Sequence, residues 1–285
     1  MNFIESAPGV KLYYEDWGSG QPVVFIHGWP LSHEMFEYQM TQLPQQGLRC
    51  IAYDRRGFGK SSKTWEGYDY NTLADDLKAL LEKLDLNDVT LVGFSMGGGE
   101  VARYFSRHGG ARVSKVVLLG SVTPYMLQTD DNPNGVPREQ FEQMAEKIKD
   151  DRPAFLADFS KVFFGVNLIS HPVSQPYLAW CQMLTTLGSP KATLECLWSF
   201  AETDFRPDMK HIKVPTLIIH GDSDKTVPIE PTGQQAAKMI PDAKYIVYEG
   251  APHGFFYTEK DKLNRDLVEF ILEPSAIPFA SPAAY

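Results

Sequence analysis

The sequence of 285 residues has few cysteines, no basic run and no metal or haem motif, and each lack excludes a class of protein. Cys50, Cys181 and Cys196 lie far apart, without the spacing of a zinc site, a redox motif or a disulfide framework. We expect buried, reduced thiols and no cofactor. The formal net charge of −9 disfavours nucleic acid and anionic membranes as partners.

Long apolar segments are also missing. No stretch approaches the roughly 20 residues that a transmembrane helix needs. The N-terminal segment MNFIESAPGV has neither the basic start nor the apolar stretch of a secretory signal peptide, so a cytoplasmic location is expected. With 43% hydrophobic and 22% charged residues, the chain can bury a large core, as one large domain or two small ones.

Short apolar runs of buried-strand type alternate with helical patterns over the first 120 residues. Leucines at helical spacing share one face of a helix predicted for 71–84, and Asn71 or Thr72 can cap its start. Another helix is expected after residue 95. This alternation predicts an α/β fold with a mostly parallel sheet covered by helices on both faces. The predicted strands are 11–17, 22–27, 50–54, 89–93 and 115–120.

The alternation stops near residue 121 and resumes at residue 215. We therefore predict an α/β core of residues 1–122 and 212–285, interrupted by a helical cap at 123–211 over one edge of the sheet. The Pro- and Ala-rich tail at 273–285 is expected to be loosely ordered. The predicted helices of the cap are 137–149, 152–163, 174–187 and 190–202, and the core resumes with strands at 215–221 and 243–250 and a helix at 258–272.

The segment LVGFSMGGGE (91–100) places a serine between glycines where a buried strand gives way to a helix. Glycine in a helix costs about 1 kcal/mol relative to alanine, so three in succession indicate crowding. G-x-S-x-G in this context is typical of a nucleophile elbow with a strained serine. We predict that Ser95 is the nucleophile. Gly93 and Gly97 would avoid collisions with backbone, and the next two glycines would let the helix approach the sheet.

A serine nucleophile needs a base and a carboxylate that orients the base. His253, in EGAPHGFF, follows the last predicted strand, at the sheet edge where the sites of α/β proteins gather. Asp224 is expected to be the acid because it lies further past its strand than Asp222, which should bond its own turn. His27 and His220 end strands and are expected to be structural. The other histidines are expected to be solvated: His33, His108, His171 and His211.

Two backbone amides would complete the site by binding an oxyanion. One should come from the loop HGWPLS (27–32) after an early strand, and the other from the start of the helix after the serine. We assign the N–H groups of Trp29 and Met96 to this role, since Pro30 has no N–H. The three charged residues at 54–56 are expected to hold their turn through an ion pair rather than to catalyse.

Taken together, these segments resemble α/β-hydrolases, specifically the cofactor-free haloperoxidase, aryl-esterase and perhydrolase group. The likeness extends over about residues 3–272 and includes YDRRGFGKSS, AETDFRPDM, PTLIIHGDSDKTVP and APHGF. It implies a triad of Ser95, His253 and Asp224, with a four-helix cap. It also implies an acyl pocket built from Trp29, Phe94, Val122, Met126, Met144, Phe159, Phe163 and Ile229.

The activity that the resemblance implies is hydrolysis of a small aryl ester through an acyl-enzyme. Peroxide in place of water would give a peracid, without haem or metal. Met126, Met144 and Ile229 stand where the family often has phenylalanine, so a broader pocket is expected. A lactonase, γ-lactamase or carbon–carbon bond hydrolase with the same triad is the alternative, and a small-molecule receptor with slow hydrolysis is a further one. A homo-oligomer is left open.

Overall fold

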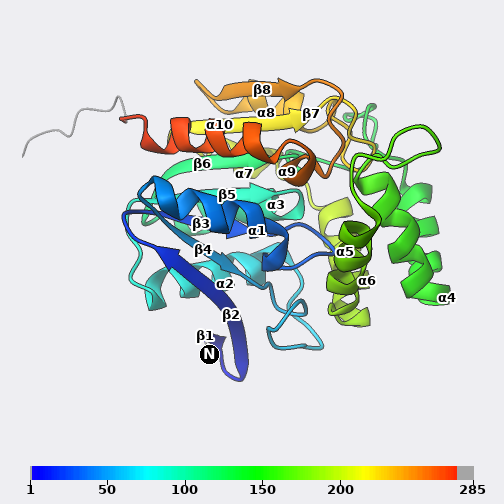
Figure 1. Cartoon of the computed structure of the whole chain (residues 1–285), viewed down its shortest axis with the longest axis horizontal. Coiled ribbons are helices and arrows are strands. Elements are labelled where there is room, and N and C mark those ends of the chain that lie inside the picture. Colours follow the sequence, from blue (N-terminus) through cyan, green and yellow to red (C-terminus); the bar gives the residue numbers. More distant parts are fainter. Residues whose placement is uncertain (1, 275–285) are drawn as a thin grey trace, which may run out of the picture.

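An eight-stranded sheet forms the centre of the protein, in the order β1-β2-β4-β3-β5-β6-β7-β8 (Figure 1). The computed structural model describes residues 2–274, so the part of the predicted loose tail at 275–285 lies outside the described residues. From β4 to β8 the neighbouring strands run parallel, while β1–β2 and β2–β4 are antiparallel. The predicted α/β fold is confirmed. The strands are β1 Phe3–Ala7, β2 Val10–Gly18, β3 Gln21–Ile26, β4 Leu48–Tyr53, β5 Val89–Phe94, β6 Val113–Leu119, β7 Thr216–Gly221 and β8 Lys244–Tyr248.

The first strand is an addition to those predicted from the sequence. β1 forms an antiparallel edge hairpin with β2, in which Ile4 pairs with Leu12 and both side chains are buried. The other side chains of β1 are exposed or half-buried. One buried residue in a short strand leaves no alternation for the sequence pattern to reveal.

Helices cover both faces of the sheet (Figure 1). Apolar side chains of α1, α9 and α10 pack on one face, and those of α2, α3 and α8 pack on the other. No helix within residues 2–274 is long and apolar enough to cross a bilayer. These helices are α1 Glu37–Gln42, α2 Tyr70–Lys83, α3 Met96–His108, α7 Arg206–Met209, α8 Gly233–Met239, α9 Phe255–Thr258 and α10 Lys260–Leu272, with 3-10 turns η1 His33–Phe36 and η2 Leu43–Gln46.

The start of α2 differs from the prediction. The helix begins at Tyr70, and its N-cap is Asp69, whose carboxylate accepts a hydrogen bond from the N–H of Thr72 at 3.0 Å. Asn71 and Thr72, the predicted caps, lie in the first turn instead. Asp69 has the extended backbone of an N-cap, and its short carboxylate satisfies an N–H that has no partner inside the helix.

Three helices lie beyond the carboxyl ends of the strands, on the right in Figure 1: α4 Arg138–Phe163, α5 Gln175–Thr186 and α6 Pro190–Glu202. Their ranges agree with the predicted helices. The predicted helices 137–149 and 152–163 correspond to the two halves of α4, which meet at Asp151, whose backbone is not helical (φ −145°, ψ 85°). Its carboxylate accepts from the N–H of Ala154 and so caps the second half, where Pro153 needs no N–H partner.

The charged residues at 54–56 bond to residues outside their turn. Arg55 is buried and pairs with Glu100 on α3, and Arg56 pairs with Asp76 on α2, with nitrogen–oxygen distances of 2.6 and 2.7 Å in the second pair. The expected ion pairing that holds the turn is thus present, and its partners lie on two helices. Each buried guanidinium needs a carboxylate, and that of Asp54 in the same turn is bonded to His33 and Lys60 instead.

His33 corrects another expectation, because it is buried rather than solvated. Its Nδ1 lies 2.7 Å from the Asp54 carboxylate, which also accepts the backbone N–H groups of His33 and Lys60. His108 is half-buried and bonds to Asp75 at 2.8 Å. The partners of His33, the Tyr13 ring at a centroid distance of 5.2 Å and the Asp54 carboxylate, come from other parts of the sequence, so the loop alone does not reveal its burial. His171 and His211 are exposed, as expected.

The three cysteines are buried and free, as expected for thiols without a structural bridge. Burial raises the pKa of each thiol to about 12. They are therefore protonated, inert side chains of the core at neutral pH.

Candidate active site

Ser95 lies at the sharp turn between β5 and α3. Its backbone has φ 54° and ψ −119°, a conformation that costs a residue with a side chain about 1–3 kcal/mol. The turn is held by hydrogen bonds from the Ser95 N–H to Leu119 O and from the Val122 N–H to Ser95 O. The side chain is only 5% exposed and lies at the edge of a cavity. The chain thus presents a hydroxyl from a rigid, strained turn.

The glycines around this serine are required by close approaches of the backbone. A Cβ on Gly93 would lie 2.7 Å from the carbonyl oxygen of Gly97, and a Cβ on Gly97 would lie 2.4 Å from that of Ile26. The next two glycines differ in what they face. Gly98 abuts Ser121 after β6, but Gly99 abuts Tyr70 and Phe205, so its role is packing against helices rather than the sheet. A Cβ on Gly99 would lie 2.5 Å from the ring of Phe205 and 2.6 Å from the ring of Tyr70.

A histidine from a distant loop contacts this hydroxyl, and an aspartate from another loop contacts the histidine. The Nε2 atom of His253 lies 2.9 Å from the Oγ of Ser95, and its Nδ1 lies 2.5 Å from the Oδ2 of Asp224. His253 precedes α9, after β8, and Asp224 follows β7. All three side chains lie at the carboxyl edge of the sheet because they follow parallel strands. A histidine bonded on both sides in this way can take a proton from the hydroxyl.

The Asp224 carboxylate has more partners than the sequence indicated. Its Oδ1 accepts the N–H groups of Thr226 (2.9 Å) and Val227 (2.8 Å). Its Oδ2 also lies 3.5 Å from Nε2 of His220, which is buried and bonds the carbonyl oxygen of Val227. Burial raises the pKa of Asp224, but the charge of His253 and the hydrogen bonds outweigh it, and the pKa lies below its usual range. The acid is therefore ionised.

The neighbouring Asp222 bonds across to another loop. Its Oδ1 accepts the N–H of Gly250, which follows β8, at 2.7 Å, and the hydroxyl of Ser223 lies 3.3 Å away. The expected bond within its own turn is thus a minor contact. Asp222 ties the loops that carry Asp224 and His253 to each other.

The backbone N–H groups of Trp29 and Met96, near Ser95, are among those that donate to no acceptor within residues 2–274. Met96 is the first residue of α3, and Trp29 lies in the loop after β3 and lines the same cavity as Ser95. A Cβ on Gly28 would lie 3.0 Å from the Cβ of Ser95, so this loop abuts the serine. The two amides are the ones predicted to hold an oxyanion.

Comparisons with known proteins agree with this fold. A family model described as the alpha/beta hydrolase fold matches residues 21–260. The chain is 45% identical to a non-heme chloroperoxidase of Kitasatospora aureofaciens, over 95% of this chain and 99% of that one. It is 39% identical to a bifunctional esterase/perhydrolase of Acinetobacter calcoaceticus, with the same coverage. A crystal structure of a bromoperoxidase from Bacillus anthracis superposes with a TM-score of 0.90 at 48% identity, covering 92% of this chain and 95% of that one.

The chain belongs to the α/β-hydrolase family. The resemblance found in the sequence is therefore confirmed, and the protein is a hydrolase.

The cavity of this α/β-hydrolase has a volume of about 480 Å³ and lies between the sheet edge and the helices α4 and α6. Trp29 forms its aromatic centre, with ring centroids 5.2 Å from Phe159 and 5.4 Å from Phe200. Phe155 stacks on Phe159. Exposed charged residues form the outer part: Lys147, Asp150, Asp151, Asp158 and Lys225. The inner part can thus bind an uncharged planar group.

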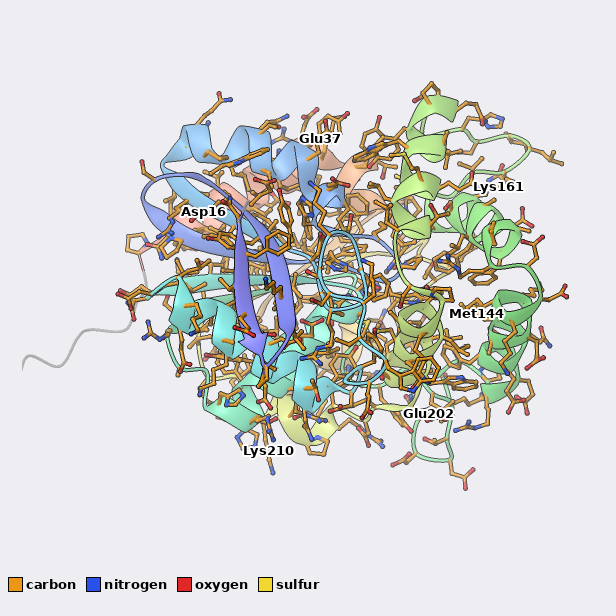
Figure 2. All side chains as sticks on the ribbon, turned by 90° about the horizontal axis from the view of Figure 1, so that it is seen from below. Asp16, Glu37, Met144, Lys161, Glu202 and Lys210 are labelled. Atoms are coloured by element: carbon orange, nitrogen blue, oxygen red, sulfur yellow. The ribbon has the colours of Figure 1, made fainter. Side chains whose placement is uncertain are left out.

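The predicted acyl-pocket residues separate into two sets. Trp29, Val122, Met144 and Phe159 line the cavity, and Figure 2 shows Met144 on α4 at one end of the molecule. The cavity lining does not include four others within the described residues: Phe94, Phe163, Met126 and Ile229. Phe94 and Phe163 instead pack on the His253 ring, with centroids 4.8 and 4.7 Å away. Met126 and Ile229 are buried, and Met126 belongs to the larger hydrophobic core.

Several lining residues were missed by the sequence analysis. Phe155 lies one helical turn before Phe159, and Phe141 lies three residues before Met144, so helical spacing from predicted residues would have found both. Phe200, on α6, gave no such signal because its contact with Trp29 depends on how two distant elements pack.

His27, beside this site, makes the stability of the hydrolase depend on pH. Burial, followed by the charge of Arg55, lowers the pKa of His27 to about 3. The unfolded chain binds this proton near pH 6.5, so between pH 6.5 and pH 3 it holds more protons than the folded chain. Stability therefore falls with falling pH, by about 2 kcal/mol from pH 7 to pH 5 for this group.

A His27→Asn variant is expected to lack this loss, because asparagine does not titrate. Urea unfolding of both proteins at pH 7 and pH 5 measures it. The wild type should lose about 2 kcal/mol more than the variant between the two pH values. Equal losses would contradict a neutral, buried His27.

Proposed function

We propose that this α/β-hydrolase hydrolyses small aryl esters through an acyl-enzyme on Ser95 and also catalyses perhydrolysis. The observation that carries the proposal is the hydrogen-bonded series Ser95–His253–Asp224 at the edge of an aromatic cavity. The names of the relatives, which include an esterase/perhydrolase and a chloroperoxidase, support it. Residues 123–211 are proposed as the cap that selects the substrate.

In the proposed reaction, the Oγ of Ser95 attacks the ester carbonyl carbon while Nε2 of His253 takes its proton. The carbonyl oxygen becomes an anion, to which the N–H groups of Trp29 and Met96 donate. The intermediate collapses, and the alcohol leaves with the proton from His253. Asp224, ionised, stabilises the imidazolium that exists between these two proton transfers.

Water then repeats the sequence on the acyl-enzyme. His253 takes a proton from the water, whose oxygen attacks the acyl carbon, and the acid leaves as Ser95 regains its proton. Hydrogen peroxide in place of water gives a peracid by the same atom transfers. A peracid can oxidise halide in solution, so haloperoxidation follows from the ester chemistry without a redox group on the protein.

A substrate panel tests the proposal. Aryl esters of short and long acids, lactones and γ-lactams are incubated with the enzyme, with and without hydrogen peroxide, and kcat/KM is measured for each. Aryl esters of short acids should have the highest kcat/KM, and peroxide should yield peracid from them. A higher kcat/KM for lactones or lactams would replace the proposed function by the alternative. Turnover of only a few equivalents would indicate a receptor.

A further inference from the structure

His27 lies between the end of β3 and the loop that carries Trp29, and it is fully buried. Its Nε2 is 3.0 Å from the backbone nitrogen of Arg55, and its Nδ1 is 3.0 Å from the carbonyl oxygen of Gly28. A backbone N–H only donates, so Nε2 must be the unprotonated nitrogen. The proton of the neutral ring is therefore on Nδ1, from which it is donated to Gly28 at 3.0 Å, while Nη1 of Arg55 lies further from this nitrogen, at 3.4 Å.

The surroundings keep this ring neutral. The guanidinium of Arg55 lies beside it, donating from Nη2 to the carbonyl oxygen of His27 at 2.7 Å and pairing with Glu100 on α3. Burial and this cation lower the pKa of His27, while Asp54 acts weakly in the opposite sense. One tautomer, with its N–H directed at Gly28, is thus selected.

The accepting carbonyl belongs to the same peptide group as the Trp29 N–H. This peptide is trans, since the cis bonds of the described chain are Trp29–Pro30 and Thr123–Pro124. In a planar trans peptide the C=O and N–H point in opposite directions. Fixing the oxygen of Gly28 therefore fixes the direction of the Trp29 N–H. The N–H of Leu31 also donates to this oxygen, at 3.1 Å.

We propose that His27 is a positioning residue that orients the Trp29 N–H toward the oxyanion by donating its Nδ1 proton to Gly28. The inference rests on the proposed function, in which that N–H binds the oxyanion. Without this bond the peptide could rotate and present its oxygen where the anion forms. The close approach of Gly28 to Ser95 makes such a rotation harmful, because the wrong end of the peptide dipole would face the reacting atoms.

Three variants test the proposal by steady-state kinetics on an aryl ester. His27→Leu removes the donor, whereas His27→Asn keeps an amide N–H near the position of Nδ1. His33→Leu is the matched control, since His33 is a buried histidine of the neighbouring loop that bonds Asp54. Circular dichroism and thermal unfolding verify that each variant is folded.

The His27→Leu variant should lose roughly 10²-fold in kcat with KM changed less than about threefold, as expected for loss of one oxyanion donor. The asparagine variant should recover at least about tenfold of this loss, and the His33→Leu control should stay within about threefold of wild type. A kcat of His27→Leu within threefold of wild type would overturn the proposal. Equal losses for His27→Leu and His33→Leu, or for leucine and asparagine at residue 27, would also overturn it.

If His27→Leu does not fold, His27→Gln replaces it. The longer amide reaches the position of Nε2 and can accept from Arg55, but it does not donate to Gly28, so its kcat should lie at least about tenfold below that of His27→Asn. Equal kcat values would overturn the proposal.

A phosphonate reagent separates this inference from the proposed function. The reagent modifies Ser95, and mass spectrometry gives the rate without any ester turnover. Its phosphoryl oxygen needs the same two amides, so modification of His27→Leu should be roughly 10²-fold slower than that of wild type, with His27→Asn between them. Wild type that is modified rapidly but turns over no aryl ester would refute the proposed substrate alone. Equal modification rates would refute the role of His27.

Discussion

Replacing Ser95 by alanine is expected to lower kcat for a small aryl ester by at least about 10³-fold. In the proposed reaction this hydroxyl forms the acyl bond, and its Oγ lies 2.9 Å from Nε2 of His253. A residual rate is expected because the oxyanion amides and the cavity still bind and polarise the substrate. Steady-state kinetics with active-site titration of the wild type measure the ratio.

Ser121→Ala is the matched control for this substitution. Ser121 is a buried serine just after β6, whose hydroxyl bonds Thr123 rather than His253. Its variant should keep kcat within about threefold of wild type. Near-full activity of Ser95→Ala on the aryl ester would end the assignment of the nucleophile.

Replacing Asp224 by asparagine is expected to lower kcat by about 10⁴-fold. The N–H groups of Thr226 and Val227 both donate to one oxygen of this side chain, so the oxygen of an asparagine would remain with them. Its NH₂ group would then face Nδ1 of His253 and donate to it. The ring would carry its proton on Nε2, the tautomer that cannot take a proton from Ser95.

The measurement compares Asp224→Asn with Asp222→Asn at pH 7. Asp222 follows the same strand but bonds the N–H of Gly250, which an asparagine oxygen can still accept, so its variant should retain kcat within about threefold of wild type. If Asp224→Asn kept more than a tenth of the wild-type kcat, or if both variants lost the same factor, Asp224 would not be the acid of the triad.

The convergence of Ser95, Asp224 and His253 could be predicted because each follows a parallel strand. Such loops meet at one edge of the sheet whatever the rest of the chain does, so the positions of Ser95, Asp224 and His253 in the sequence limit where they lie in space. The structure places His253 within hydrogen-bond distance of both Ser95 and Asp224. The sharp turn at Ser95 could also be predicted from the sequence, because the collisions that Gly93 and Gly97 avoid are local consequences of a strand–turn–helix connection.

Partners from distant segments could not be predicted in this way. Arg55 and Glu100 lie 45 residues apart, and nothing in either segment indicates that their side chains meet. The same holds for His33, whose burial depends on elements that pack over its loop. The cavity wall is an intermediate case, since α4 has a readable periodicity but the approach of Phe200 to Trp29 is set by tertiary packing. Features with local causes can be predicted from the sequence, whereas contacts between elements that are distant in the sequence cannot.

The indole of Trp29 donates from Nε1 to the carbonyl oxygen of Thr193 on α6, at 2.9 Å. Trp29 thus links α6, which lines the substrate cavity, to the loop whose N–H is proposed to bind the oxyanion. A substitution that moves α6 to admit a bulkier substrate would also move Trp29 and its backbone N–H. Selection for a new substrate in this enzyme should therefore change kcat and substrate preference together. Variants designed to change substrate preference without changing kcat should keep the hydrogen bond between Trp29 and Thr193.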